Sequence, residues 1–181
     1  MSTDALGDLE RLLREQDEPQ LNPEEYKQVF RRHPAGVAVV TLAGPEGPVG
    51  FTATSVISVS ADPPLLGFVI ASTSSSWPAV RSASTVAVNF LGAGSRALSQ
   101  RFATRGVDRF DGAAWTALPT GEPIFDEATT WVRGRVMQRI PAGDSYLVTL
   151  RALTSGAPRA GAPLVYHDRS YHHIGGHSEL E

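Results

Sequence analysis

The most informative segment of the chain is residues 50–60, with the sequence Gly-Phe-Thr-Ala-Thr-Ser-Val-Ile-Ser-Val-Ser. Its β-branched residues favour a β-strand. The apolar residues cluster instead of alternating with the hydroxyl side chains, as they would on a strand with one buried face. Gly50 and Ala53 leave room for a flat molecule close to the backbone. Neutral donors and acceptors suit a neutral polar ligand, although an edge strand facing water can have the same composition.

The composition indicates one domain, or one domain with an appendage. The chain has 181 residues and a formal net charge of -3, which provides no basic field for nucleic acid or an anionic membrane. The absence of Cys excludes disulfides, Cys-ligated zinc, iron–sulfur clusters and thiol nucleophiles. It also suits a reducing compartment. The N-terminus does not have the pattern of a signal peptide, and no apolar run approaches the roughly 20 residues of a membrane span. We therefore expect a cytoplasmic protein.

Two helices are expected before the β-rich part of the chain. A leucine stripe predicts an amphipathic helix over residues 3–17, with no obvious partner within the chain. The segment 22–25, Asn-Pro-Glu-Glu, combines an N-cap, a proline in the first turn and a Glu three residues after the cap. It predicts a second helix, whose buried side we expect to be Tyr26, Val29 and Phe30.

Short apolar or alternating segments separated by turns indicate an all-β architecture. We expect strands at residues 36–42, 50–60, 65–71, 85–91, 132–136, 145–153, 163–166 and 170–174. The run 65–71 is continuously apolar and is expected to be buried on both faces. A short helix capped by Ser95 extends to Arg105, and a loop is expected from there to Gly121. A parallel α/β sheet would need a helix after each strand, so we predict a mainly β barrel or sandwich.

Three polar segments flank the expected strands, namely residues 52–60, 72–76 and 89–95. In a meander or Greek key these strands would be neighbours, and their ends would converge on one groove of hydroxyls and amides. Four arginines that follow could bind a phosphate, although each alone is typical of a solvated surface. They are Arg96, Arg101, Arg105 and Arg109.

The sequence offers little for acid–base or metal chemistry. His172 and His173 should point to opposite faces of a strand and cannot share a metal without a bulge, so we expect no metal site. No nucleophile elbow, Walker loop or His-Glu-x-x-His motif occurs. If the chain is an enzyme, a bound cofactor should supply the chemistry.

An ordered set of motifs carries a family resemblance. The set comprises residues 33–37, 39–41, 50–55, 58–64, 88–91, 98–99, 102–103, 109–110, 115, 143–144, 163–166 and 171. From about Phe30 to Ile174 it resembles the short-chain flavin reductases, the reductase components of two-component flavin-dependent monooxygenases. The resemblance implies an antiparallel split β-barrel of Greek-key type with a few peripheral helices. It also implies a homodimer. The domain would span residues 26–175, with a helical extension at 1–25 and a tail at 176–181.

The resemblance also implies an activity and a set of binding residues. The protein would transfer a hydride from NADH or NADPH to free FAD or FMN and supply reduced flavin to a partner monooxygenase. Residues implied beside the isoalloxazine ring are Thr52, Ala53, Thr54 and Ser55. Ribityl, phosphate and further flavin contacts are implied for Ala71, Ser72, Ser75, Ser76, Trp77, Asn89, Phe90, Leu91, Phe102 and, more loosely, Arg109.

The nicotinamide side of the implied site departs from the family pattern. Many relatives have His directly after the Gly-Asp pair, where this chain has Ser145. The candidates for this side are therefore His33, Ser145, Tyr171 and His172. The departure keeps an alternative open, a non-catalytic flavin-binding or electron-transfer protein. Hydride transfer between stacked rings needs near-attack geometry more than a protein acid or base, so the lack of a catalytic dyad is compatible with a reductase.

Overall fold

The structure is a computed structural model that describes residues 19–180. The helix expected over residues 3–17 lies outside the described residues. The chain divides after His33 into two compact units, which are described separately. Among the described residues, no helix is long and apolar enough to cross a membrane.

The first unit contains helix α2 (Pro23–Arg31), which begins where the sequence predicts. The Asn22 side chain accepts hydrogen bonds from the backbone N–H groups of Glu24 and Glu25, both at 3.0 Å. The Glu25 carboxylate in turn accepts a hydrogen bond from the backbone N–H of Asn22 at 3.0 Å. This reciprocal capping box satisfies N–H groups that the first helical turn leaves without partners.

The expectation of a buried side on α2 is wrong for the described residues. Tyr26, Val29 and Phe30 are 53%, 60% and 54% exposed. The Tyr26 and Phe30 rings contact each other, with centroids 4.7 Å apart. No other described element of the first unit covers this face, so the amphipathic pattern is present without the packing that it predicts.

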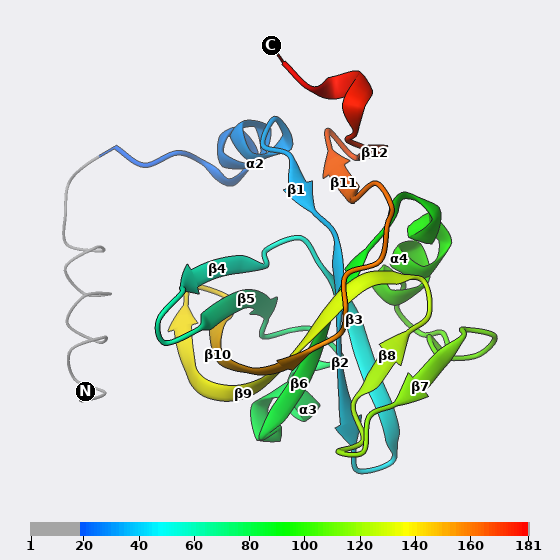
Figure 1. Cartoon of the computed structure of the whole chain (residues 1–181). Coiled ribbons are helices and arrows are strands. Elements are labelled where there is room, and N and C mark those ends of the chain that lie inside the picture. Colours follow the sequence, from blue (N-terminus) through cyan, green and yellow to red (C-terminus); the bar gives the residue numbers. More distant parts are fainter. Residues whose placement is uncertain (1–18, 181) are drawn as a thin grey trace. The chain divides into compact units, whose positions relative to one another are not determined.

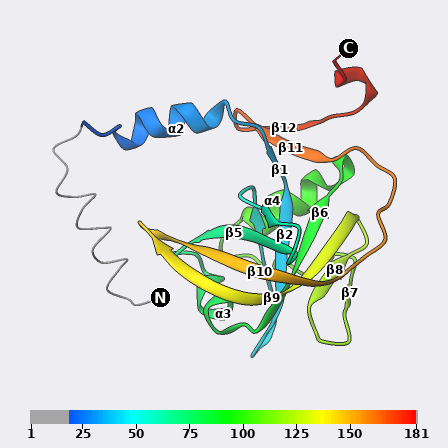
Figure 2. The ribbon, with the colours of Figure 1, turned by 60° about the vertical axis from the view of Figure 1, so that its left-hand side comes forward.

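The second unit is built around an antiparallel seven-stranded sheet, in the order β3-β2-β6-β9-β10-β5-β4 (Figure 1). Its strands are β2 (Ala38–Gly44), β3 (Gly47–Ala53), β4 (Ile57–Ser60), β5 (Leu65–Ala71), β6 (Thr85–Leu91), β9 (Ala128–Ala142) and β10 (Ser145–Ser155). The long strands β9 and β10 curve together through the unit (Figure 2). The prediction of a mainly β, antiparallel fold with few helices is therefore confirmed.

Two smaller sheets and short helices complete the unit. One sheet joins β1 (Ala35–Gly36), β11 (Leu164–His167) and β12 (Ser170–His173), and the other joins β7 (Trp115–Ala117) and β8 (Pro123–Phe125). The helices are α3 (Trp77–Ser82), α4 (Arg96–Ala103) and the 3₁₀ turns η1 (Ala93–Ser95) and η2 (Gly176–Ser178). The strand β7 lies within the region expected to be a loop. Ser95 precedes α4, but its hydroxyl donates to the Glu127 carbonyl instead of capping the helix.

The segment 50–60 is two strands and not one. β3 ends at Ala53 and pairs with β2, whereas β4 begins at Ile57 and pairs with β5, so the two strands form opposite edges of the sheet. Ser55 fixes the crossing between them, because its hydroxyl accepts from the Val69 N–H at 2.9 Å and donates to the Val69 carbonyl at 3.2 Å. This crossing explains why the apolar and hydroxyl residues cluster instead of alternating.

Hydrophobic clusters cover both faces of the central strands. In β2, Val40 belongs to the cluster around Phe68 and Val148, and Val39 belongs to the cluster around Leu91 and Phe102. β6 is also buried on both faces along most of its length. β5 is largely buried, but Val69 is 40% exposed, so the expectation of burial on both faces holds only in part.

Candidate functional site

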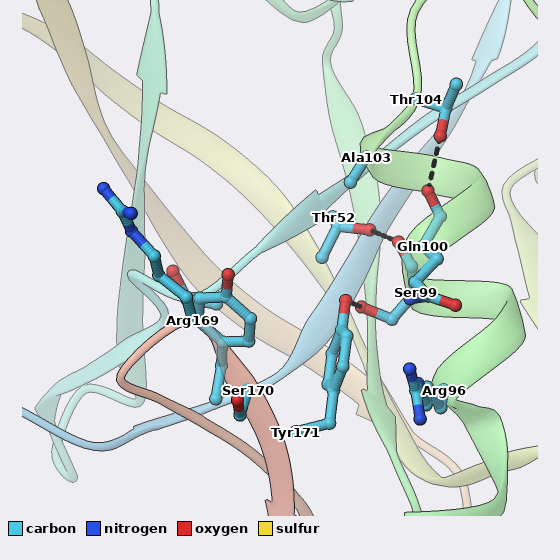
Figure 3. A pocket seen from close by; sticks show the side chains of 11 residues that line it. Thr52, Arg96, Ser99, Gln100, Ala103, Thr104, Arg169, Ser170 and Tyr171 are labelled. Carbon is cyan, nitrogen blue, oxygen red and sulfur yellow. Dashed lines mark hydrogen bonds between the residues drawn. The ribbon is translucent and has the colours of Figure 1, made fainter. Parts of the chain in front are cut away.

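A cleft of about 830 Å³ is lined by residues from β3, α4 and the β11–β12 hairpin (Figure 3). Its lining residues are Thr52, Thr54, Arg96, Ser99, Gln100, Ala103, Thr104, Tyr166, Arg169, Ser170 and Tyr171. The volume lies within the range of small-molecule sites. The lining carries hydroxyl, amide and guanidinium groups, and none of these described residues is acidic. The cleft therefore suits a polar ligand that carries an anionic group.

Hydrogen bonds connect the three elements that form the cleft. The Thr52 hydroxyl donates to the Ser99 carbonyl at 2.6 Å, which ties β3 to α4. The Ser99 and Tyr171 hydroxyls lie 2.9 Å apart and share a hydrogen bond, which ties α4 to β12. The Arg96 guanidinium carbon lies 5.9 Å from the Tyr171 ring centroid, within cation–π range. These contacts hold the wall of the cleft in one arrangement.

A second hollow, of about 350 Å³, is lined by residues that include Gly50, Ser75, Ser76 and Arg109. Arg109 donates to the Gly50 carbonyl at 2.8 Å, to the Ser76 hydroxyl at 3.1 Å and to the Ser75 hydroxyl at 3.5 Å. Its Nε donates to the Thr104 carbonyl at 3.0 Å, and Thr104 also lines the first cleft. Burial, together with the positive charge of Arg105, lowers the pKa of Arg109. The guanidinium remains charged, and most of its donors already have partners.

The space expected above Gly50 is filled by the protein itself. A Cβ on Gly50 would lie 2.7 Å from the Phe102 ring, so glycine is required for this contact. Phe102 is 1% exposed and packs edge-to-face against Phe110 and Phe125. Gly50 therefore accommodates a core aromatic ring, and the Phe102 side chain does not line the cleft.

Several other residues implied by the resemblance have buried side chains. They are Ala53, Ser76, Trp77, Asn89 and Leu91. Trp77 stacks on Tyr146, with ring centroids 3.9 Å apart. The Asn89 amide donates to the Val39 carbonyl at 3.1 Å and accepts from the Phe125 N–H at 3.1 Å. These side chains organise the strands behind the cleft, and Phe90 lines a separate apolar groove.

The remaining candidates fall outside the cleft. Ser145 pairs with Ala71 in the sheet, and the Ser72 hydroxyl donates to the Asp144 carbonyl at 2.7 Å. His172 is exposed on β12, and His33 belongs to the first unit.

The expectation that one groove gathers all three polar segments is therefore wrong. β3, β6 and β5 are not adjacent in the sheet, because β2 separates the first two and β9 and β10 separate the last two. Of the predicted residues, the cleft brings together Thr52, Thr54, Tyr171 and Arg96.

Sequence reasoning missed most of the α4 wall and the hairpin. The missed residues are Ser99, Gln100, Ala103, Thr104, Tyr166, Arg169 and Ser170. On α4 the spacing from Arg96 to Ser99 or Gln100 and on to Ala103 is that of one helical face, and this pattern could have identified the wall. Arg169 lies in a two-residue hairpin turn. The local sequence has no glycine or asparagine that would have predicted this turn.

Comparisons with known proteins give the same family as the motifs. The model of the flavin reductase like domain family matches residues 30–175. The NADH:FMN oxidoreductase of Rhodococcus erythropolis is 46% identical over 153 residues, which cover 82% of this chain and 80% of that protein.

Solved structures agree in fold. The flavin reductase domain protein of Arthrobacter sp. FB24 matches with a TM-score of 0.82 at 36% identity, covering 88% of this chain and 98% of that one. The nitrilotriacetate monooxygenase component B of Mycobacterium thermoresistibile matches with a TM-score of 0.82 at 27% identity. The match covers 87% of this chain and 89% of that one. Since the family model spans most of the chain and the relatives align over most of their own length, this chain belongs to the flavin reductase like domain family.

Proposed function

We propose that this protein is an NADH-dependent flavin reductase that reduces free FMN or FAD and supplies the reduced flavin to a partner monooxygenase. The observation that carries the proposal is the cleft between β3, α4 and β12, which has polar and cationic groups and no acidic group among its described lining residues. The relative that is 46% identical is named an NADH:FMN oxidoreductase. The similar structure named a monooxygenase component B supports the partnership.

The residues of the cleft fit a flavin. The isoalloxazine ring is neutral and has several hydrogen-bonding edges, and the phosphate of FMN is anionic. Thr54 lines the cleft, and no hydrogen bond engages its hydroxyl within the described chain, so it is free to bond a ligand. Arginine side chains suit the phosphate. When bound, the flavin supplies a ring that can accept a hydride from nicotinamide.

In this reaction the residues of the protein bind the flavin and the nicotinamide and orient their rings. We assign ring contacts to the side chains of Thr52 and Thr54 and to the backbone of Ala53 on β3. Tyr171, whose hydroxyl lies 2.9 Å from that of Ser99, would supply a wall contact. Holding two rings in a near-attack arrangement can account for a large part of the rate enhancement without any proton transfer by the protein. Three other implied residues would support the flavin site without touching the flavin, because their polar groups already form hydrogen bonds within the protein. They are Ser55, Ser76 and Asn89.

We also propose the finer features that the resemblance implies. The domain would be a split β-barrel over residues 26–175 that works as a homodimer, and the Cys-free sequence supports a cytoplasmic location. Exposed apolar residues on the edge strand β4 support the dimer, since Ile57 is 52% and Val59 is 50% exposed. Strand edges of this kind are usually covered in native proteins.

Steady-state turnover tests the activity. The purified protein is mixed with NADH and a large excess of FMN, and oxidation of NADH is followed by its absorbance. We expect many flavins to be reduced per protein molecule. A single stoichiometric reduction without turnover, or none, would exclude the reductase and favour a flavin carrier or an electron-transfer protein. Parallel assays with FAD and with NADPH define the substrate preferences.

A further inference from the structure

Ser99 places a hydroxyl group on the buried face of α4. The buried residues of this helix are Leu98, Ser99 and Phe102, and Ser99 is 0% exposed. Its carbonyl accepts a hydrogen bond from the Thr52 hydroxyl at 2.6 Å, which holds this point of the helix against β3. A buried hydroxyl between apolar core side chains costs stability unless it is hydrogen-bonded. The partner of the Ser99 hydroxyl therefore indicates what this group does.

The direction of the hydrogen bond between Ser99 and Tyr171 follows from burial. Within the described chain, the Tyr171 hydroxyl at 2.9 Å is the one partner of the Ser99 hydroxyl (Figure 3). If Tyr171 donated, the Ser99 proton would be buried without an acceptor, because water does not reach a residue with no exposed surface. An unsatisfied buried donor is disfavoured by roughly tenfold or more. The opposite direction, from Ser99 to Tyr171, leaves no buried group unsatisfied.

The Tyr171 hydroxyl then keeps its own proton for a ligand. Tyr171 is partly exposed and lines the cleft. No second partner engages its hydroxyl within the described chain, so the phenol proton has no acceptor once Ser99 donates. The ring packs against Tyr166, with centroids 5.2 Å apart, which limits its rotation. The cleft thus contains a hydroxyl donor at a fixed position.

We propose that Ser99 is a positioning residue that donates to Tyr171, and that Tyr171 in turn donates to a carbonyl oxygen of a substrate bound in the cleft. This role rests on the proposed function and deepens it, because both proposed substrates offer such an oxygen. The flavin has carbonyl groups on the isoalloxazine ring, and NADH has one in its carboxamide. Successive hydrogen bonds polarise one another, so Ser99 strengthens the Tyr171 donor as well as orienting it.

Equilibrium binding tests this role without requiring turnover. Dissociation constants are measured for riboflavin by fluorescence and for NAD⁺ by calorimetry, with wild type, Ser99→Ala, Tyr171→Phe and the double variant. Infrared difference spectra record the carbonyl stretches of each bound ligand, which a hydrogen bond lowers in frequency. Ser95→Ala is the matched control, because Ser95 is 1% exposed next to α4 and its hydroxyl donates to the Glu127 carbonyl at 3.1 Å, outside the cleft lining.

We expect Tyr171→Phe to weaken the ligand that it contacts by about two- to tenfold and to raise the frequency of the carbonyl stretch. Ser99→Ala should give a smaller loss, because the Tyr171 proton then has no fixed direction. In the Tyr171→Phe background it should give no further loss, since Ser99 acts through Tyr171. A loss for either ligand supports the proposal, and the ligand affected identifies which carbonyl accepts.

The double variant separates binding from folding. Tyr171→Phe alone leaves the Ser99 hydroxyl buried without a partner and should lower the melting temperature. Removing both hydroxyls leaves neither group unsatisfied, so the double variant should recover much of the melting temperature while its affinity stays low. Ser95→Ala should melt at a lower temperature than wild type with unchanged affinity.

Two results would overturn the assignment. Unchanged affinity and carbonyl frequency for both ligands in Tyr171→Phe and in the double variant would exclude the donor. Equal losses from Ser95→Ala and Ser99→Ala would exclude the positioning role of Ser99. If wild type binds riboflavin in a Tyr171-dependent way but shows no turnover with NADH, the proposed reductase activity fails and the hydrogen bond stands. Turnover with unchanged affinities in Tyr171→Phe gives the reverse, an active reductase without this donor.

Discussion

At the scale of single residues, the neighbouring hydroxyls of Thr54 and Ser55 have different tasks. Thr54 is exposed and lines the cleft, and the described chain provides no hydrogen-bond partner for its hydroxyl. The Ser55 hydroxyl is engaged twice by the backbone of Val69. A double substitution would therefore mix a loss of binding with a loss of structure, and single substitutions separate the two.

Thr54→Val should weaken flavin binding without changing stability. One lost hydrogen bond to a neutral group contributes about 0.5–1.5 kcal/mol, which corresponds to roughly two- to tenfold in the dissociation constant. The melting temperature should not change, because the Thr54 hydroxyl makes no hydrogen bond within the described chain. Fluorescence titration with riboflavin, combined with thermal melting, gives both values. An unchanged dissociation constant would remove Thr54 from the flavin site.

Glu122 is a buried carboxylate away from the cleft, and its effect should appear in the pH dependence of stability. Its side chain is 1% exposed, accepts hydrogen bonds from the Thr85 and Thr120 hydroxyls and pairs with Arg133 at 3.0 Å. Burial by itself raises the pKa of Glu122. The hydrogen bonds from Thr120 and Thr85 and the charge of Arg133 outweigh burial and lower the pKa below its ordinary value.

Glu122→Gln should destabilise the protein at neutral pH by about 1.5–3 kcal/mol, the value of hydrogen bonds to a charged group. Because the folded-state pKa is the lower one, the stabilisation is fully present above the unfolded pKa of about 4.3 and is lost as the pH falls through the folded value. The difference in melting temperature between wild type and variant should therefore shrink below about pH 4. A difference that stays constant down to acid pH would contradict the assigned ion pair.

At the scale of elements, the crossing between β3 and β4 depends on Ser55. Ser55→Ala leaves the Val69 N–H without its partner and should lower the unfolding free energy by about 1 kcal/mol, since Val69 is partly exposed and water can replace the bond. Thermal melting measures the effect, with Ser58→Ala on β4 as a control because no hydrogen bond engages the Ser58 hydroxyl within the described chain. Equal effects of both changes would show that the crossing does not depend on this contact.

Local signals in the sequence predicted the elements whose structure is determined locally. The capping box at Asn22 and the alternation in residues 85–91 correspond to α2 and β6. The break within residues 50–60 could not be predicted, because it depends on the distant backbone of Val69. The burial of Asn89 and Phe102 depends equally on long-range partners, namely Phe125 and the space above Gly50. The motifs thus identified the β3 part of the cleft and Tyr171. The helical spacing on α4 could have identified that wall, whereas Tyr166, Arg169 and Ser170 of the β11–β12 hairpin required the three-dimensional structure.

At the scale of the whole molecule, the proposed homodimer explains the apolar edge of β4. Ile57 and Val59 are half exposed there, and the neighbouring apolar groove of about 320 Å³ is lined by residues that include Val56 and Phe90. Sedimentation should give about twice the chain mass of 19.3 kDa. Ile57→Lys combined with Val59→Lys should give a monomer that melts cooperatively, because both side chains are exposed in the single chain. A wild-type monomer, or a double variant that remains dimeric, would refute this interface.

The location of the flavin is the central claim, and a crystal structure of the protein with FMN bound tests it most directly. We predict the isoalloxazine ring against Thr52 and Thr54, beside Tyr171. Flavin bound in the apolar groove of Val56 and Phe90, with the cleft empty, would contradict the account.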